Sequence, residues 1–505
     1  MNKNKIATIV NSKYYPLLLF FVSFIFVTLF SRSTSFLYVF EGGDPAIFKQ
    51  MGLALLRGKT LYVDYFDNKG CILYFIQALG LWLGGNFFIL LMQAISLTIT
   101  LMIWDKMLAL YRDERGRLIC LSIALVLLLC FYQDGDLTEE WCLPFASYPL
   151  LVYFRALKSN KEIHPYNWLI IGLCFGIIAF VRVNNAAPFL GFVIYLFIVC
   201  LIRKNFKKFL INVSCFLSGV IIIACACILY FYLKAGWYGV DEMFYATFLS
   251  NFEYLGLKGK RKAFFCFFYF LFLLLCFTQQ ILNSRNDKEI LAPSIISYLL
   301  FFITFGTRCF THYLMALLPL LVVLLMTTDF QSNKKEILSL RISAIIAVFF
   351  YLPIPIALAF NDLVLKNDKY SIIYNNFHHC LENIPKTELD SIYNYNLYGS
   401  GVALLQHEKL LQSNRVLFSS FAFKYKRLNK EELEKPFYPP KWILFSWNRK
   451  YAKRDAYIIL NYYDFYCEFP YDRIYLKKPK IGKTFQVYLY RRKDNIFELI
   501  ESEKP

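Results

Sequence analysis

Apolar segments close to the length of a bilayer-spanning helix recur along most of this chain and constrain its fold more than any other feature. About eleven of them precede residue 361: 15–40, 86–110, 118–132, 141–156, 168–181, 186–202, 209–233, 263–282, 291–305, 314–328 and 342–360. A transmembrane helix needs about 20 mainly apolar residues. A transmembrane barrel would instead show alternating strands of about 10 residues, and these runs are continuous. The sequence therefore predicts a polytopic α-helical membrane protein.

The distribution of Lys and Arg between these segments predicts which loops face the cytoplasm. Lys3, Lys5 and Lys13 precede the first segment, so we expect a cytoplasmic N-terminus. Counting from there, each loop predicted to be cytoplasmic holds at least two Lys or Arg, and each short outer turn holds none or one. One outer loop, 234–262, is an exception because it carries Lys258, Lys260, Arg261 and Lys262. Either a crossing is miscounted or these cations bind an anionic group outside.

The net charge favours a membrane partner over nucleic acid. Charged residues are 18% of the chain and the formal net charge is +19, whereas a soluble domain averages about 25% charged residues. The excess Lys and Arg lie in short loops, where they set topology and meet anionic head groups. We therefore expect membrane lipids, and no nucleic acid, as partners. Of the 14 cysteines, Cys380 and Cys467 fall in the polar tail; they can pair if that tail lies outside, which the sequence leaves open.

The polar stretch after the first segment, with two short helices, forms a first outer loop at residues 41–85. Asp44-Pro45 predicts a helix start, because Asp suits the N-cap and Pro the first helical position. The helix, ending at Gly58, would have an apolar and a polar face, made by Ile47, Met51, Ala54 and Leu55 and by Lys49, Gln50 and Arg57. This pattern predicts an amphipathic helix lying on the membrane surface. Residues 72–84 are too short to span and predict a second surface helix.

The composition changes at residue 361, where Tyr, Asn, Lys and Asp rise and no apolar run of span length remains. The remaining stretch of about 145 residues is within the usual size of one domain. Short strand-like and helix-like patterns alternate in it, at residues 388–396, 414–420, 441–447 and 455–463. We therefore predict a transmembrane domain at residues 1–360 and an extracytoplasmic soluble α/β domain at residues 361–505.

Acidic residues at the outer ends of the segments are candidates for catalysis. Asp44, just beyond the first crossing, is well placed as a general base for a hydroxyl acceptor, and N-capping is a compatible second role. In the turn at 133–140, Asp134 and Asp136 are spaced to hold a divalent ion through oxygen ligands. Glu139 and Glu140 follow, and acids that enter a membrane segment are usually functional. The alternative is a solvated turn before a helix N-terminus, which favours acids.

Cationic and polar side chains at the same outer face are candidates for binding phosphate. They are Lys69, Arg182, Lys258, Lys260 and Arg308, with His312 and Tyr313 close to the last. A guanidinium binds phosphate oxygens in a fork; the alternative is an arginine that snorkels to the interface. Asp64, Asp67 and Asn184 are expected to support the loops, and Lys69 alternatively forms a plain surface ion pair with Asp67. Together, these groups suit glycosyl transfer from a lipid-phosphate sugar.

Residues 44–80 resemble the first outer loop of the GT-C membrane glycosyltransferases. The likeness is to the bacterial branch related to protein O-mannosyltransferases and to the lipid A aminoarabinose transferase. The branch motif, Asp-Ser-Ser…Gly-x-x-Pro-Tyr-x-Asp-x-Phe-Asp-His-Lys-Gly-Pro, is matched by Asp44, Gly58, Tyr62, Asp64, Phe66, Asp67, Lys69 and Gly70. Further matches are Thr138-Glu139-Glu140, Arg182-x-Asn184, and His312-Tyr313 followed by Pro319. The sequence departs from the motif at Pro45, Asn68 and Cys71.

The resemblance implies a GT-C fold and transfer of a sugar from a polyprenyl-phosphate donor to a hydroxyl of a glycan, lipid or protein. It places this reaction on the outer face of the bacterial plasma (inner) membrane. It implies that Asp44 is the catalytic base and that Glu139 and Glu140 position the acceptor or, in some members, a metal. Outer-face basic residues would hold the donor phosphate. No cofactor is required by this reading, and a divalent metal is left open.

Three other functions fit the sequence less well. A flippase or transporter of lipid-linked sugars would carry polar groups near the midplane of the membrane. A polysaccharide polymerase would place its chemistry in a large outer loop between later segments, where this chain has only residues 234–262. A non-catalytic relative is the third alternative, because of the departures at Pro45, Asn68 and Cys71.

Overall fold

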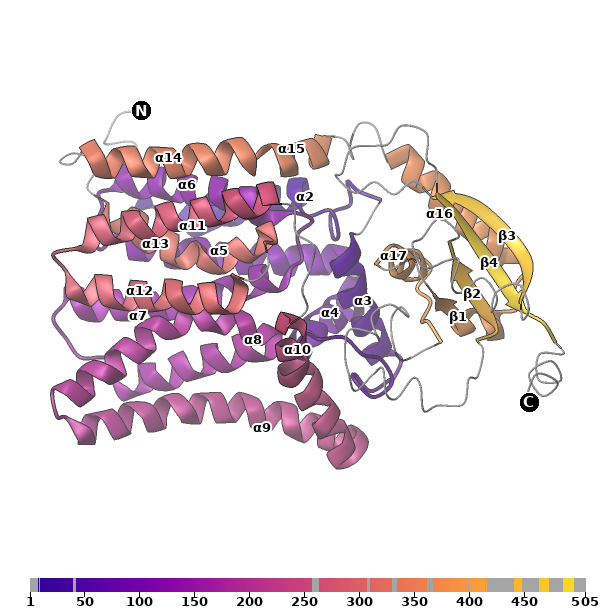
Figure 1. Ribbon diagram of the computed structural model, residues 1–505, viewed down its shortest axis with the longest axis horizontal. Helices are drawn as coiled ribbons and strands as arrows, with labels where there is room; N and C mark the ends of the chain where they lie inside the picture. The colour runs from indigo at the N-terminus through magenta and orange to yellow at the C-terminus, as the bar shows by residue number, and fades with distance from the viewer. Residues whose placement is uncertain are drawn as a thin grey trace.

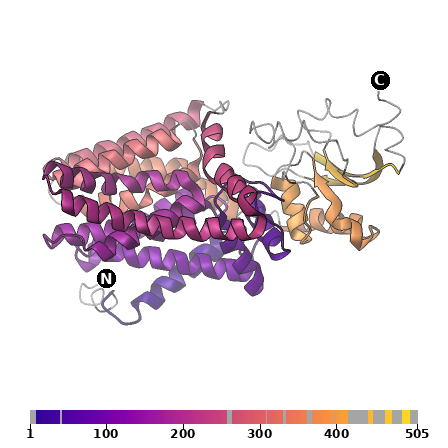
Figure 2. The same ribbon diagram turned by 90° about the horizontal axis from the view of Figure 1, so that it is seen from below.

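A bundle of long helices occupies one end of the molecule, and two helices and a small sheet from the C-terminal part occupy the other (Figure 1). The second view shows the same division (Figure 2). The computed structural model describes residues 8, 10–39, 42–256, 263–306, 309–328, 334–360, 363, 367–395, 397, 399–413, 415, 440–446, 463–471 and 485–494.

Six helices in the described part of the chain are long and apolar enough to cross a membrane. They are α5 (Asn86–Leu108), α6 (Glu114–Tyr132), α8 (Pro165–Ile202), α9 (Phe206–Phe244), α11 (Ala263–Ser284) and α12 (Lys288–Phe305). The bundle also contains α2 (Tyr15–Phe30), α7 (Thr138–Lys158), α13 (Leu318–Thr327), α14 (Lys334–Phe350) and α15 (Pro353–Phe360). The number of crossings, about eleven, stays a prediction.

Helix α8 is a hairpin of two antiparallel halves. The ring of Trp168 stacks on that of Phe197 with centroids 5.1 Å apart, although a straight helix would separate these positions by about 44 Å. Nearer the turn, the rings of Phe175 and Phe189 lie 6.1 Å apart. The chain reverses at Arg182, whose backbone is extended (φ −164°, ψ 114°). The two segments predicted at 168–181 and 186–202 are therefore separate halves, and Arg182 lies at the turn between them.

Helix α9 breaks near its C-terminal end. Gly236 there has φ 61° and ψ −155°, a conformation that residues with a Cβ adopt only with strain. Beyond the break the chain crosses the end of the bundle through the rest of α9, a π-helical turn η1 (Tyr245–Leu249) and α10 (Ser250–Gly256) (Figure 1). The predicted outer loop at 234–262 is thus helical through residue 256.

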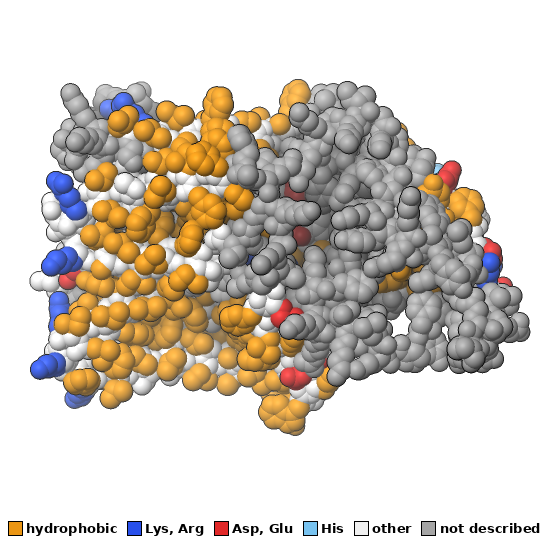
Figure 3. Space-filling view, viewed as in Figure 1, with side chains coloured by type: hydrophobic (Ala, Val, Ile, Leu, Met, Phe, Trp, Pro, Cys, Tyr) orange, Lys and Arg blue, Asp and Glu red, His pale blue; other side chains and the backbone are white. Residues whose placement is uncertain are grey.

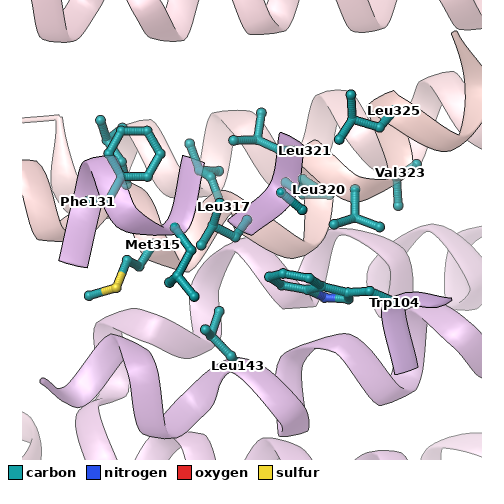
Figure 4. Packing of buried hydrophobic residues seen from close by; sticks show 14 of the residues in the cluster. Trp104, Phe131, Leu143, Met315, Leu317, Leu320, Leu321, Val323 and Leu325 are labelled. Atoms are coloured by element: carbon teal, nitrogen blue, oxygen red, sulfur yellow. The ribbon is translucent and has the colours of Figure 1, made fainter. Parts of the chain in front are cut away.

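Helix α13 lies at the centre of the bundle although it has only 10 residues. Every residue from Leu318 to Met326 is buried, and a helix that is hydrophobic all round is expected in a core. Figure 4 shows Leu320, Leu321 and Leu325 of this helix in the buried cluster that also contains Phe131 of α6 and Trp104 of α5. On the outside, the bundle presents a broad hydrophobic band, with Lys and Arg side chains at the end remote from the C-terminal part (Figure 3).

Helix α2 ends earlier than predicted. The predicted first segment extends to residue 40, but α2 ends at Phe30 and a polar run follows, Ser31 to Ser35. Hydroxyls of this run find partners on α5: Ser31 Oγ and Thr34 Oγ1 donate to Gln93 Oε1, at 3.2 and 2.5 Å. These hydrogen bonds to α5 hold the polar run beside that helix, where the chain turns from the end of α2 toward the first outer loop.

Two short helices, α3 (Gly43–Leu56) and α4 (Cys71–Gly84), form in the first outer loop as predicted. The prediction that α3 presents a free polar face was wrong for Lys49 and Gln50, which are 0% and 1% exposed. Lys49 Nζ donates to the carbonyl of Ser33, and Gln50 Nε2 donates to the carbonyl of Leu410 at 2.8 Å. The polar face is covered because α3 packs between α4 and the C-terminal part of the chain.

The described part of residues 361–505 contains α16 (Asn367–Glu382), a 3₁₀ turn η4 (Lys386–Ser391), α17 (Gly399–His407) and four strands. The strands are β1 (Ile392–Asn394), β2 (Trp442–Phe445), β3 (Tyr463–Tyr471) and β4 (Phe485–Arg492), and they form one sheet in the order β1-β2-β4-β3. The β1–β2 pair is parallel and the other two pairs are antiparallel. Patterns at 388–396 and 441–447 contain β1 and β2; those at 414–420 and 455–463 lie mostly outside the described residues.

A disulfide joins Cys380 of α16 to Cys467 of β3. These are the two cysteines of the polar tail whose pairing the sequence left open. The bond fastens the helix across one edge of the sheet, because β3 is the last strand in the order.

Candidate active site

Asp44 lies exposed in the first turn of α3. The helix is capped by Gly42, whose φ is 78°, so the prediction that Asp44 is the N-cap was wrong. No hydrogen bond or ion pair joins its carboxylate to another described residue. An acid in the first turn is favoured by the helix dipole, and an unengaged carboxylate at the surface is available to accept a proton.

Arg182, at the turn of the α8 hairpin, is held by residues from two other elements. Its Nη1 lies 2.6 Å from Glu139 Oε1, and the two side chains are 6% and 1% exposed. Its Nη2 donates to the hydroxyl of Tyr313 at 3.0 Å, and the guanidinium lies over the Tyr313 ring, 4.6 Å from its centroid. The structure thus joins three predicted site residues in one buried cluster, which we call the Arg182 cluster.

His312 lies beside this cluster, with its ring centroid 4.5 Å from that of Tyr313. Its Nδ1 lies 2.8 Å from Gln133 Oε1. It is also within electrostatic range of Asp44, Glu139, Arg182 and Asp134. The exposed carboxylate, the paired guanidinium and the imidazole therefore share one region at the end of the bundle, beside the C-terminal part of the chain.

Asp134 fixes the start of the first outer loop. Its Oδ1 lies 2.7 Å from Nη1 of Arg32, which is 5% exposed. Gly42 packs directly against it, because a Cβ on Gly42 would lie 3.3 Å from Asp134 Oδ2. Arg32 was not among the predicted site residues, although it is the one cation in the polar run that follows α2.

Glu140 and Asp136 are enclosed beneath the surface. Glu140 accepts hydrogen bonds from the Tyr132 hydroxyl at 2.7 Å, from Gln93 Nε2 and from the Asp136 backbone at 2.8 Å. Asp136 Oδ1 accepts from Gln77 Nε2 at 2.6 Å and from Trp141 Nε1 at 2.9 Å. These contacts suit a structural role, with the two acids holding α4, α5 and α7 together.

The possible metal pair, Asp134 and Asp136, does not fit a bound cation well. Arg32 engages the first carboxylate, and amide and indole N–H groups engage the second. Divalent ions of the Mg²⁺ and Ca²⁺ type are usually bound by several free oxygen ligands. Among the described residues, no group of three or more His, Cys, Asp or Glu is arranged to hold a metal.

The second half of the first outer loop, residues 57–70, is closely packed. Asp67 accepts from the Tyr74 hydroxyl at 2.6 Å and lies 3.6 Å from Lys69 Nζ, so the alternative of a Lys69–Asp67 ion pair is present. Asp64 accepts from the Thr60 backbone N–H at 2.6 Å. Lys69 remains 16% exposed and lies over the Phe48 ring.

Gly70 attaches this loop to the α8 hairpin. Its N–H donates to the carbonyl of Val181 at 3.0 Å, directly before Arg182. A Cβ on Gly70 would lie 2.0 Å from the carbonyl oxygen of Phe180, so only glycine permits this approach. The Lys-Gly motif therefore positions the turn that carries Arg182. Asn184, predicted to support the loops, is buried just beyond this turn.

The C-terminal part clamps the loop from the other side. Arg415 donates to the carbonyl of Tyr62 through Nε at 3.0 Å and Nη2 at 2.6 Å, and it pairs with Glu242 of α9. Tyr62 has φ 67°, a conformation that persists only where the surroundings enforce it. The Tyr65 hydroxyl donates to the carbonyl of Gln412 at 2.5 Å, and burial raises the pKa of this phenol, keeping it a donor. No motif pointed to Arg415 or Glu242.

The remaining predicted phosphate ligands, Lys258, Lys260 and Arg308, lie outside the described residues. Their roles stay predictions. The neighbouring segments are described: α10 ends at Gly256, and the chain resumes at Cys309 before the 3₁₀ helix η2 (Thr311–Leu317), which carries His312 and Tyr313.

No family model matches this chain, and no curated protein is detectably similar to it. The structure is similar to the apo oligosaccharyltransferase of Archaeoglobus fulgidus, with a TM-score of 0.54 and 10% identity, over 90% of this chain and 73% of that one. The archaeal oligosaccharyltransferase AglB of the same organism, in complex with an inhibitory peptide and a dolichol-phosphate, aligns with a TM-score of 0.47 and 12% identity, over 96% of this chain and 77% of that one.

The first of these comparisons establishes the fold. The chain shares the fold of that oligosaccharyltransferase, which is the GT-C fold that the motifs of the first outer loop implied. At 10% identity the likeness concerns the fold alone; the reaction has to be argued from the side chains at the end of the bundle.

Proposed function

We propose that this protein is an inverting glycosyltransferase that moves a sugar from a polyprenyl-phosphate donor to an acceptor hydroxyl outside the plasma membrane. The observation that carries the proposal is the exposed carboxylate of Asp44 in the same region as the buried Arg182 cluster. Such a reaction needs a base for the acceptor hydroxyl and positive charge for the leaving phosphate.

In this mechanism Asp44 takes the proton of the acceptor hydroxyl. The acceptor oxygen attacks the anomeric carbon, and the bond from that carbon to the phosphate oxygen breaks with inversion. The polyprenyl phosphate leaves with the additional negative charge. Preorganised positive groups aimed at such developing charge usually supply the largest catalytic term.

Arg182 is the described residue best suited to hold that phosphate. Glu139 and Tyr313 fix the orientation of its guanidinium, and a guanidinium held in one orientation suits the fork-like recognition of phosphate oxygens. Lys69 is a second candidate, since it is partly exposed in the loop that packs on the α8 turn. Lys258, Lys260 and Arg308 are proposed to join them.

Two observations support an orientation with this site outside the cell and the N-terminus in the cytoplasm. Lys and Arg gather at the opposite end of the bundle (Figure 3), as expected for cytoplasmic loops. The Cys380–Cys467 disulfide lies in the C-terminal part, and such bonds persist in oxidising compartments. The motifs of the first outer loop further support a bacterial inner-membrane enzyme.

The most direct test of the activity uses the purified full-length protein and a panel of polyprenyl-phosphate sugars. Loss of sugar from one lipid, dependent on a glycan, lipid or protein acceptor, is the expected result. Movement of intact lipid-linked sugar across proteoliposome membranes, with no cleavage of any donor, would favour a flippase and contradict the proposal.

A further inference from the structure

Two cysteines that belong to no assigned site lie side by side at the end of the bundle that carries the candidate active site. Cys266 is near the start of α11 and Cys309 precedes η2, and their sulfur atoms are 3.3 Å apart. Both side chains are partly exposed. The other close pair of thiols, Cys71 and Cys227, is 3.5 Å apart but buried.

We propose that Cys266 and Cys309 form a disulfide that staples the outer end of α11 to the segment leading into the active site. The inference rests on the outward orientation in the proposed function, because disulfides persist in oxidising compartments. A disulfide bond is about 2.05 Å long, so the sulfurs need to approach by only a little over 1 Å. Partial exposure gives an oxidant access to at least one of them.

The bond forms by thiol–disulfide exchange with a disulfide-containing oxidant of that compartment. One cysteine thiolate attacks a sulfur of the oxidant, giving a mixed disulfide and releasing one thiol. The second cysteine thiolate then attacks the protein sulfur of the mixed disulfide and releases the other thiol. Two protein thiols are oxidised to one disulfide, and the oxidant is reduced to two thiols that carry both protons.

The staple would act on the active site through η2. Cys309 is separated by only three residues from Tyr313, which accepts a hydrogen bond from Arg182, and by two from His312, which contacts Gln133. Without the bond, the segment from Cys309 to Tyr313 is anchored through these side chains and its packing. With it, the segment is also covalently fixed to α11, so Cys266 and Cys309 are positioning residues for the Arg182 cluster.

The test is thiol mapping on the full-length protein in native membranes. Membranes are quenched in acid, denatured and treated with N-ethylmaleimide; the protein is then reduced and labelled with a second, heavier maleimide. The Cys380–Cys467 disulfide serves as the internal reference for orientation. We expect the heavy label on Cys266 and Cys309 as well, and a linked peptide pair containing both before reduction.

Two outcomes would overturn the proposal, and they are distinguishable. Light label on Cys266 and Cys309, with heavy label on Cys380 and Cys467, removes the staple and leaves the outward orientation standing. Light label on all four cysteines removes the staple together with the orientation on which the proposed function depends.

Melting temperatures provide a second test of the disulfide, and this test does not depend on enzymatic activity. Cys266→Ser, Cys309→Ser and the double variant should lower the melting temperature by the same amount, because each removes the same bond. Reductant should lower the melting temperature of the wild type by more than that of the double variant, because the double variant has only the Cys380–Cys467 disulfide left to lose. Additive effects of the two single substitutions, or equal sensitivity of the double variant to reductant, would contradict the staple.

Discussion

At the scale of single residues, the site depends on how Arg182 is held. Its guanidinium is buried, and removing one partner of a buried ion pair costs about 3–5 kcal/mol because a charge is left unpaired. Glu139 and Tyr313 satisfy it from α7 and η2. The same contacts keep the fork in one orientation, which suits recognition of phosphate oxygens.

We expect Arg182→Lys to lower the rate of sugar transfer by about 100-fold, the effect typical of losing one preorganised donor to developing charge. The charge is kept, but the fork to Glu139 and Tyr313 is lost. Turnover of the lipid-linked donor measures the effect. The control is Arg203→Lys, an exposed residue whose ion pair with Glu289 is 3.9 Å long; a loss of similar size there would show that the assay responds to any change of arginine.

At the scale of elements, the first outer loop is held between two neighbours. Gly70 attaches it to the α8 hairpin through the carbonyl of Val181, and Arg415 attaches it to α9 through Glu242. The C-terminal part therefore belongs to the construction of the site, since it closes over the loop that carries Asp44 and Lys69.

The ion pair between Arg415 and Glu242 should contribute measurably to the free energy of unfolding. Glu242 is 0% exposed, so Arg415→Ala should destabilise the protein by about 3–5 kcal/mol because it removes the cation that pairs with this buried carboxylate. Adding Glu242→Gln should recover part of the loss, giving a coupling of about 0.5–3 kcal/mol. Chemical denaturation in detergent measures both values.

The matched control for this cycle is the pair Arg57–Asp390, whose side chains are 36% and 59% exposed. Exposed pairs contribute about 0–1 kcal/mol, so Arg57→Ala should have little effect. Strictly additive losses for Arg415→Ala and Glu242→Gln would mean that the clamp does not couple the two segments.

At the scale of the whole molecule, the chain has two unlike ends. One carries Lys and Arg in the turns between helices (Figure 3); the other carries the candidate site, the disulfide and the sheet. The proposed transfer from a lipid-linked donor requires a site at one membrane face, and the different chemistry of the two ends of the molecule supports that proposal.

Reporter fusions test the polarity directly. Alkaline phosphatase, which is active only after export, should be active when fused beyond residue 494 and inactive when fused at Asn160, in the turn between α7 and α8. Activity at Asn160, or its absence at the C-terminal fusion, would reverse the orientation.

Much of this organisation was predictable because it depends on short patterns. Apolar length fixed the long helices, and the charge of the turns separated the two ends. The sequence also named Asp44, Glu139, Arg182 and Tyr313, and the last three meet in one cluster.

The sequence did not indicate which side chains become buried against distant parts of the chain. The contact of Gln50 with Leu410 and that of Arg415 with Tyr62 each join residues more than 300 positions apart in the chain. Likewise, enclosure of Glu140 by Tyr132 and Gln93 follows from packing of α5 to α7, which no local pattern encodes. The prediction that Asp44 is the N-cap was wrong because the helix begins two residues earlier than Pro45, at Gly43, with Gly42 as its N-cap.

Single-turnover transfer by Asp44→Asn, compared with Asp113→Asn at the opposite end of the bundle, is the decisive measurement. Asp113 caps α6, accepting from the Gly116 N–H at 2.9 Å, and Asn is an equally good cap. We predict that Asp44→Asn binds the donor lipid with unchanged affinity and loses transfer by about 10²–10⁴-fold, the contribution of a general base, while Asp113→Asn transfers normally. Transfer by folded Asp44→Asn at the wild-type rate would contradict the assignment of this carboxylate as the base.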